Sequence, residues 1–292
     1  MERHPYFDLW LHSTDELTAF LSNGVIERST LHEWPLSCVQ LLKLNDGSQL
    51  IYKSQLRATT VEPDFFKTIQ DESDKKAHAI YSLLPKAILV GYMQNSVAMF
   101  IEFIDAPRLE DQSLDEASII EHGIQLQQVM EKLPSNLPVY TDISSTEKWI
   151  IMVSDTLSML KGLIESEKFK LHTMAGVKAL ENFALSASVL AAFQRPIVLN
   201  HHDLGGDNVF LTPDGYKIID WQRPVRGPIG LDLANYLTAM GIDPLQRVSP
   251  AILGVFQFLR LRWLVECKTH WFPPGEIYDR QVADLSEQIL QL

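Results

Sequence analysis

Hydrophobic and polar residues alternate along much of the first hundred positions, which is the period of a half-buried β-strand. The stretch from Ser37 to Leu56 predicts two strands joined at Asn45-Asp46-Gly47, a turn that favours a hairpin, and Lys53 lies on the second strand. Residues 64–84 then mix polar and apolar positions as a helix does, and residues 87–104 predict two more strands around a turn at 94–96. With a short helix expected at 15–21, this region is small and mainly β.

Hydrophobic residues return at helical spacing beyond residue 105. Ser113-Leu114-Asp115-Glu116 has the form of a capping box, so we expect a helical region to begin there. Three later stretches each present one apolar stripe, which is more typical of helices packed in a bundle than of a cofactor site. The stripes are Ile150, Val153, Leu157, Leu160 and Ile164; Leu180, Phe183, Ala187 and Leu190; and Ile252, Val255, Leu259 and Trp263, the last on a final long helix before Pro273-Pro274.

The composition is that of a folded globular protein, because 46% of the 292 residues are hydrophobic, enough for two domains or one large bilobed one. The formal net charge of -12 argues against nucleic-acid or anionic-membrane partners and favours a cationic or neutral small partner. Cys38 and Cys267 show neither metal-ligand spacing nor a disulfide framework. With no charged leader and no apolar run long enough to span a bilayer, a cytoplasmic location is expected.

Polar ligand types gather between residues 199 and 222, in the stretch LNHHDLGGDNVFLTPDGYKIIDWQ. The spacing predicts a loop that carries Asp203 and Asn208, a short hairpin through TPDG, and a strand that returns Asp220 to the same place. Because Mg²⁺ is held by oxygen ligands together with substrate phosphates and water, Asn208 and Asp220 suit it. Asp203 is then left to act on a hydroxyl group.

Other interpretations of this stretch stay open at the level of residue types. A polar turn between two core strands accounts well for Asp207 and Asp214, the second of which precedes a glycine. His201, His202 and Asp203 could instead bind a transition metal in a hydrolase, because imidazole and carboxylate suit such ions. Adjacent histidines point in different directions on an extended chain, however, and the remaining histidines are scattered.

The order His201-x-Asp203, then Asn208, then the aspartate of IIDW resembles the aminoglycoside phosphotransferase and choline kinase-like family, a distant relative of protein kinases. The segment from Gly227 to Ala234 looks like the family's glycine-to-Asp-Leu-Ala segment. The resemblance implies an α+β, bilobed protein kinase-like fold. It places a β-rich nucleotide-binding lobe at residues 1–104 and a mainly helical lobe, with catalytic loop and acceptor site, at 105–292. In such proteins ATP binds between the lobes and its γ-phosphoryl group moves to a small-molecule hydroxyl.

The resemblance also implies roles for the residues of the 199–222 stretch. Asp203 would be the catalytic aspartate that orients the acceptor hydroxyl and takes its proton, while Asn208 and Asp220 would hold Mg²⁺ against the phosphates. His201 and Asp232 would brace the catalytic loop.

In the first hundred residues, the resemblance implies a nucleotide site around Lys53. This residue matches the strand lysine that pairs with the phosphates, and Glu72 on the following helix is its preferred carboxylate partner, with Glu62 and Asp71 as alternatives. The backbone from Glu102 to Ile104 would meet the edge of the adenine.

The sequence departs from the family's pattern at several positions. The stretch LHEWPLSCVQ has no glycine where protein kinases cover the phosphates with a glycine-rich loop, which leaves Ser37 and nearby backbone amides for that role. His202 stands where the family often has glycine, and Gln222 where an acidic residue often follows the tryptophan. His202 and Glu266 are candidates for contacting the acceptor.

These features predict an ATP-dependent, magnesium-requiring phosphotransferase, with GTP as the alternative nucleotide. Acceptor classes implied by the resemblance are aminoglycosides, macrolides, choline-like amino alcohols, sugars and hydroxylated amino acids, and the acidic balance favours a cationic one. A nucleotide-binding pseudoenzyme without turnover is the alternative, although all three principal catalytic positions hold competent residues.

Overall fold

The computed structural model describes residues 1–71, 82–272 and 276–292. The chain falls into two compact units. Unit 1 comprises Met1–Ser113, Asn136–Tyr140 and Gly206–Pro224, and unit 2 comprises Leu114–Ser135, Thr141–Gly205 and Val225–Leu292. Both units are discontinuous in the sequence, whereas the expected lobes were continuous. That the functional lobes divide at residue 104 stays a prediction.

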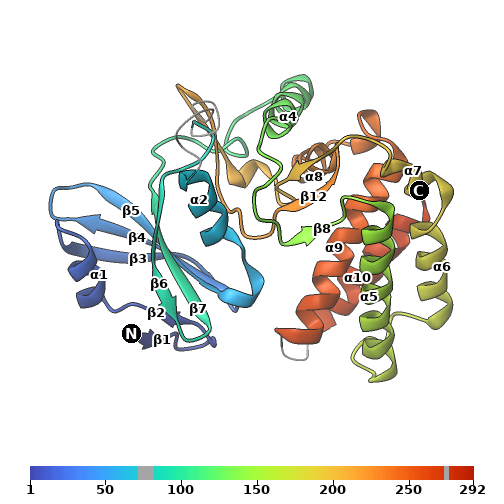
Figure 1. Cartoon of the computed structure of the whole chain (residues 1–292), viewed down its shortest axis with the longest axis horizontal. Helices are drawn as coiled ribbons and strands as arrows, with labels where there is room; N and C mark the ends of the chain where they lie inside the picture. Colours follow the sequence, from blue (N-terminus) through green and yellow to red (C-terminus); the bar gives the residue numbers. More distant parts are fainter. Residues whose placement is uncertain (72–81, 273–275) are drawn as a thin grey trace. The chain divides into compact units, whose positions relative to one another are not determined.

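Five antiparallel strands form the main sheet of unit 1, in the order β3-β4-β5-β7-β6 (Figure 1). The strands are β3 (Val25–Trp34), β4 (Ser37–Leu44), β5 (Gln49–Leu56), β6 (Ala87–Met93) and β7 (Ser96–Glu102). The last four confirm the two predicted strand pairs. The edge strand β3 was not expected, because its pairing with β4 shifts between Val25 and Glu27 and again between Thr30 and His32. Such bulges interrupt the alternation from which a strand is predicted.

The β4–β5 hairpin closes where the sequence predicts it. Gly47 has a φ of +82°, a left-handed conformation that glycine adopts without steric cost. The Asp46 carboxylate accepts a hydrogen bond from the backbone N–H of Ser48 at 2.9 Å. The turn therefore sets a register in which Val39 pairs with Lys53.

The N-terminal segment covers one face of this sheet. It contains β1 (Glu2–Arg3), β2 (Trp10–Leu11) and α1 (Thr14–Phe20). Because successive residues of a strand point to opposite faces, Tyr52 of β5 joins the core under this segment while Lys53 points to the other face. The buried cluster consists of Leu9, Leu11, Leu17, Cys38, Leu42, Leu44, Tyr52, Met93, Ala98 and Phe100.

The other elements of unit 1 come from two distant parts of the chain. A 3₁₀ turn (Arg57–Thr59) leads into α2 (Glu62–Asp71), which packs against β6 and is the described part of the helix expected at 64–84. The hairpin of β10 (Val209–Thr212) and β11 (Gly215–Ile218) follows a 3₁₀ turn at Gly206–Asn208. It belongs to unit 1 because Ile218 N–H donates to Leu83 O at 2.7 Å and Leu109 N–H donates to Val209 O at 2.8 Å.

Unit 2 is mainly helical. Its helices are α4 (Glu116–Met130), α5 (Thr146–Glu165), α6 (Met174–Ala184), α7 (Ala187–Ala192), α8 (Leu231–Ala239), α9 (Pro250–His270) and α10 (Glu276–Leu290), with a 3₁₀ turn at Pro244–Gln246. A small sheet joins β8 (Thr141–Asp142), β12 (Val225–Pro228) and β9 (Ile197–Asn200), in that order. Figure 1 shows α5, α6, α9 and α10 side by side, and α9 also contacts α7 and α8. Because α9 has neighbours on most sides, its buried residues are not confined to one stripe.

The helix boundaries correct two expectations. The capping box expected at Ser113 is wrong, because α4 is capped by Asp115, whose side chain accepts from the Ser118 N–H at 2.8 Å. Asp115 is extended and lies directly before the first helical residue, where an oxygen reaches the exposed N–H groups. The single stripe expected from Leu180 to Leu190 is divided between α6 and α7, because Ser186 caps a new helix.

The helix expected at 252–263 is confirmed by α9, but it is not the final one, because α10 follows it. No helix in the described part of the chain combines the length and apolar character needed to cross a membrane.

Candidate active site

A buried lysine pairs with two carboxylates in unit 1. Lys53 Nζ lies 2.7 Å from Glu62 Oε2 and 2.8 Å from Asp220 Oδ1. The side chains of Lys53 and Glu62 are 6% and 0% exposed, whereas that of Asp220 is 30% exposed. Asp220 is therefore the member of this cluster that solvent reaches.

The pleat of β5 and the start of α2 place the first two members. Lys53 and Gln55 are two residues apart and point to the same face of the sheet. Gln55 Nε2 donates to the same Glu62 oxygen, at 2.8 Å, and the Glu62 N–H at the start of α2 donates to Thr60 Oγ1 at 3.1 Å. Glu62 Oε2 therefore accepts hydrogen bonds from two side chains of β5, those of Lys53 and Gln55.

Trp221 connects the start of α2 with the segment after β11. Its backbone N–H donates to Glu62 Oε1 at 3.0 Å, and its indole stacks on Phe65 of α2 with ring centroids 4.5 Å apart. Both rings are fully buried, and the N–H of Val61 donates to Gln222 O at 3.0 Å. Because Asp220 directly precedes Trp221, this packing holds Asp220 beside Lys53.

The two carboxylates determine the charge state of Lys53. Burial would lower the pKa of a lysine, since it disfavours the ammonium form. The Coulombic attraction of Asp220 and of Glu62 outweighs burial, so the pKa of Lys53 lies above its ordinary value. The cluster thus holds one ammonium and two carboxylates, with one net negative charge.

Asn208 and Asp220 flank the β10–β11 hairpin at the same end. Asn208 directly precedes β10, and its carbonyl accepts from the N–H of Ile219 at 3.0 Å, one residue beyond the last β10–β11 pair. Asp220 has a φ of +68°, a left-handed conformation that aspartate adopts more readily than most residues. The hairpin therefore places Asn208 and Asp220 at the same end, and that their side chains share a metal ion stays a prediction. Asp203 belongs to unit 2, and convergence of all three oxygen ligands stays a prediction.

The loop after β9 carries Asp203 and is held by Asp232 of α8. The Asp232 carboxylate accepts from the backbone N–H groups of His201 at 2.8 Å and His202 at 2.9 Å. The N–H of Asp203 donates to His201 Nδ1 at 3.3 Å. His201 and Asp232 are buried, whereas Asp203 is exposed.

Asp232 occupies its buried position because α8 begins one residue before it. Gly230 caps the helix with a φ of +103°, a conformation that side-chain-bearing residues rarely adopt, and Asp232 lies in the first turn. Burial raises the pKa of Asp232, and the charge of His201 and the two backbone N–H donors oppose that rise. Burying the Asp232 carboxylate, which holds the loop, is thus electrostatically unfavourable in itself, and its hydrogen bonds offset part of that penalty.

His202 adopts a left-handed backbone conformation with a φ of +69°, which accounts for glycine being frequent there in the family that the sequence resembles. Its ring meets Phe256 of α9 edge to face, with centroids 6.4 Å apart. Arg260, one turn further along α9, lies over the other ring of this pair at 5.7 Å. Desolvation lowers the pKa of Arg260 and the negative charge of Asp203 raises it, so this cation lies within electrostatic range of Asp203.

The remaining predicted residues have local partners. Ser37 is buried at the start of β4 and accepts from Trp34 Nε1 at 2.5 Å. Glu102 ends β7, where its N–H donates to Lys86 O at 2.8 Å, and Ile104 follows two residues later. Glu266 of α9 lies 3.7 Å from Arg262, with its side chain 16% exposed.

Sequence patterns missed Glu62, Gln55 and Arg260 as leading candidates. Glu72, the preferred partner of Lys53, lies outside the described residues, and the alternative Glu62 makes the ion pair. A signal for Glu62 was its place at the first position of a helix that follows β5. For Gln55 the signal was the two-residue spacing from Lys53 on the same strand.

The transition-metal interpretation finds no support in the geometry of the loop. Among the described residues, His201, His202 and Asp203 do not form a group of side chains close enough to share a metal ion. The backbone N–H groups of His201 and His202 donate instead to Asp232, and that of Asp203 donates to His201 Nδ1.

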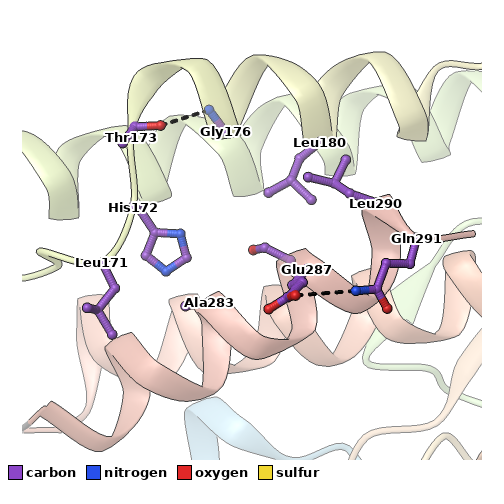
Figure 2. A pocket seen from close by; sticks show the side chains of 10 residues that line it. Leu171, His172, Thr173, Gly176, Leu180, Ala283, Glu287, Leu290 and Gln291 are labelled. Atoms are coloured by element: carbon purple, nitrogen blue, oxygen red, sulfur yellow. Dashed lines mark hydrogen bonds between the residues drawn. The ribbon is translucent and has the colours of Figure 1, made fainter.

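A pocket of about 330 Å³ lies between α6 and α10 of unit 2 (Figure 2). Figure 2 shows Leu180 of α6 and Leu290 of α10 pointing toward one another, with His172 and Glu287 further along. Of the predicted site residues that the structure describes, none lines this pocket. It is therefore separate from the cluster around Lys53 and from the loop of Asp203.

The sheet of unit 1 and the helices of unit 2 form an α+β fold, and Asp203, Asn208 and Asp220 follow one another along the chain in residue types that suit phosphoryl transfer. The model of the phosphotransferase enzyme family (APH) matches residues 95–262, more than half of the chain. The chain therefore belongs to this family, as the resemblance of residues 201–234 predicts. No sequence among curated proteins matches the chain.

Solved structures share the fold over nearly the whole chain. The apo form of a thermostable mutant of aminoglycoside phosphotransferase APH(4)-Ia has a TM-score of 0.64 at 12% identity, with 96% of this chain and 98% of that chain covered. A choline/ethanolamine kinase family protein from Mesorhizobium loti has a TM-score of 0.61 at 14% identity, covering 96% and 95%. Spectinomycin phosphotransferase APH(9)-Ia, in complex with ADP and spectinomycin, has a TM-score of 0.53 at 14% identity, covering 96% and 99%. These likenesses confirm the predicted α+β, kinase-like fold class.

Proposed function

We propose that this kinase transfers the γ-phosphoryl group of ATP, with Mg²⁺ as cofactor, to a hydroxyl group of a small molecule. The observation that carries the proposal is the buried ion pair of Lys53 with Glu62, with Asp220 as a second partner that solvent reaches. In protein kinases, phosphoryl transfer depends on a lysine paired with a carboxylate and on an aspartate that holds Mg²⁺.

Lys53 is proposed to bind the nucleotide phosphates. Glu62, itself held by a hydrogen bond from Gln55, accepts from the buried Lys53 ammonium, while Asp220 is the partner that solvent reaches. A phosphate that takes the place of Asp220 at the ammonium would leave the Glu62 contact intact. Lys53 would thus exchange one anionic partner for another without becoming an unpaired buried charge.

The donor set at the end of the β10–β11 hairpin fits Mg²⁺. Asn208 offers an amide oxygen and Asp220 a carboxylate, both hard oxygen ligands, and the cluster around Lys53 has one net negative charge. When bound, the ion would neutralise charge on the phosphates and orient them. Asn208 and Asp220 are the residues proposed to hold it.

Asp203 is proposed to orient the acceptor hydroxyl and to accept its proton. Its loop is fixed through the hydrogen bonds from residues 201 and 202 to Asp232, while Asp203 itself stays exposed to a substrate. General-base assistance of this kind contributes about 10²–10⁴-fold to a rate. His202 is proposed to contact the acceptor from the neighbouring position.

The proposed acceptor is cationic overall, as in an aminoglycoside or an amino alcohol. The net charge of -12 attracts such molecules over long range. Arg260, within electrostatic range of Asp203, would repel a positive group placed directly beside the reacting hydroxyl. The acceptor should therefore carry its charge at a distance from that hydroxyl.

Formation of ADP from ATP tests this proposal, with purified protein, Mg²⁺ and panels of aminoglycosides, macrolides, amino alcohols and sugars. Asp203→Asn should lower the acceptor-dependent rate by about 10²-fold or more. Asp207→Asn is the matched control, because Asp207 is exposed in the same stretch and has only turn chemistry assigned to it.

Equal rates for Asp203→Asn and wild type would refute the assignment of the base. Lys53→Met should raise the KM for ATP, while Lys43→Met, which removes a strand lysine from an exposed pair with Glu27, should not. Nucleotide binding without turnover on any acceptor would instead support the pseudoenzyme.

A further inference from the structure

Three side chains with metal-binding atoms meet at the end of the sheet of unit 1 that carries the β3–β4 turn. They are His4, Glu33 and Cys38, whose ligand atoms all lie within 4.8 Å of one another. His4 Nε2 is 3.1 Å from Glu33 Oε2. Neither the chemistry proposed for Lys53 nor that proposed for Asp203 uses any of these three residues.

The fold brings this group together from two directions. Glu33 of β3 and Cys38 of β4 are Cα partners in the antiparallel register, so their side chains are neighbours on one face. His4 comes from the N-terminal segment, where its N–H donates to Leu9 O at 2.7 Å and its ring stacks on Phe7 at 4.8 Å. Stacking on Phe7 of its own segment and the contact with Glu33 of β3 thus hold the ring at the hairpin.

The spacing is close to that of a tetrahedral site. With metal–ligand distances of about 2.0–2.3 Å for nitrogen, oxygen and sulfur, ligand atoms lie roughly 3.4–3.6 Å apart. The His4–Glu33 distance of 3.1 Å has to open by about 0.3–0.5 Å, and because all ligand atoms lie within 4.8 Å of one another, no pair has to close by more than about 1.4 Å, within the reach of small side-chain rotations. His4 and Cys38 are buried, while the Glu33 side chain is 43% exposed and gives an ion access from solvent.

Two local contacts would change when an ion binds. Burial raises the pKa of the Cys38 thiol to about 11, and the charge of Glu33 adds to that rise, so a divalent ion would have to displace the thiol proton. The N–H of Tyr6 donates to His4 Nδ1 at 3.3 Å, and coordination through Nε2 would leave the ring proton on Nδ1. The Tyr6 N–H would then lose His4 Nδ1 as its acceptor.

We propose that His4, Glu33 and Cys38 form a binding site for a zinc-like divalent transition-metal ion that ties the N-terminal segment to the β3–β4 hairpin. A mixed nitrogen, oxygen and sulfur set selects such ions over Mg²⁺, which takes oxygen ligands alone. The site adjoins the turn from Trp34 to Ser37, so the bound ion would restrain the stretch that replaces a glycine-rich loop.

Titration of the full-length, chelator-treated protein with Co²⁺ alone tests the site. Wild type should bind one equivalent with a near-ultraviolet charge-transfer band from the Cys38 thiolate, and Zn²⁺ should abolish the band by displacement. Cys38→Ser should lose the band. Cys267→Ser is the matched control and should keep it, because Cys267 is also a buried free cysteine but lies in α9 of unit 2.

Glu33→Gln is the variant that guards against a folding defect, because Glu33 lies at the surface. It should keep the wild-type circular dichroism and weaken Zn²⁺ binding at least tenfold, the loss that removing even an outer partner of a metal ligand causes. Absence of the charge-transfer band in wild type, or its persistence in Cys38→Ser, would overturn the proposal. Cobalt bound only at Asn208 and Asp220 would give no sulfur band and would count as the same negative result.

Discussion

The buried lysine and its two carboxylate partners should differ in how much stability their substitution costs. Lys53→Met leaves Glu62, which is 0% exposed, without a cation, although Gln55 and the Trp221 N–H still donate to it. Glu62→Gln leaves Lys53 still paired with Asp220 at 2.8 Å. We therefore expect Lys53→Met to cost more free energy of unfolding than Glu62→Gln.

The structure sets the expected magnitudes. Removing one partner of a buried ion pair costs about 3–5 kcal/mol, and the two remaining donors to Glu62 place Lys53→Met near 3 kcal/mol. Removing one hydrogen-bonding partner from a charged group that keeps another costs about 1.5–3 kcal/mol, and the remaining Asp220 places Glu62→Gln near 1.5 kcal/mol. The exposed pair of Lys43 with Glu27 is the matched control, and its variants should stay within about 0.5 kcal/mol of wild type.

Urea unfolding, followed by both far-ultraviolet circular dichroism and tryptophan fluorescence, measures these differences. Two probes are needed because two units can unfold in separate steps. The double variant of Lys53→Met with Glu62→Gln should be more stable than Lys53→Met alone, because the unpaired carboxylate is gone. A double variant whose loss equals the sum of the single losses would refute the coupling, as would a Glu62→Gln loss larger than that of Lys53→Met.

Three further predictions concern stability. Asp232→Asn should cost about 1–3 kcal/mol by urea unfolding, because an amide oxygen can replace only one of the two acceptors that hold the loop, and a loss below about 0.5 kcal/mol would contradict this. Gly254→Ala should lower the free energy of unfolding by about 1–3 kcal/mol, because a methyl group at this position collides with Phe183. Gly162→Ala has open space and should stabilise its helix by about 0.5–1 kcal/mol. Equal melting temperatures for the two variants would contradict this prediction. The hydrogen bonds from the side chain and the backbone N–H of Ser118 lower the pKa of Asp115, so its contribution to stability is present above its ordinary pKa and lost as the pH falls through its lower folded-state pKa. The melting-temperature difference between wild type and Asp115→Ala should accordingly shrink as the pH falls from about 5, and a constant difference would contradict it.

Local patterns predicted much of the fold. The strand pairs around Asn45-Asp46-Gly47 and residues 94–96 were predictable because turn residues and alternation act over a few positions. The edge strand β3 could not be predicted from the sequence pattern, because two register shifts interrupt the alternation of its buried and exposed residues. The break between α6 and α7 could not be predicted either. Ser186 caps α7, but hydrophobic residues recur at helical spacing on both sides of it.

The sequence by itself determined the family and the residue types of the site, because Asp203, Asn208 and Asp220 follow one another at spacings that a single loop and hairpin impose. Only the tertiary structure decided which carboxylate meets Lys53. Glu62 and Glu72 are both near Lys53 in the chain, but the stacking of Phe65 on Trp221 and the hydrogen bond from Val61 to Gln222 direct the start of α2 at β5. Those contacts join residues more than 150 positions apart, and their energy depends on burial that no local pattern encodes.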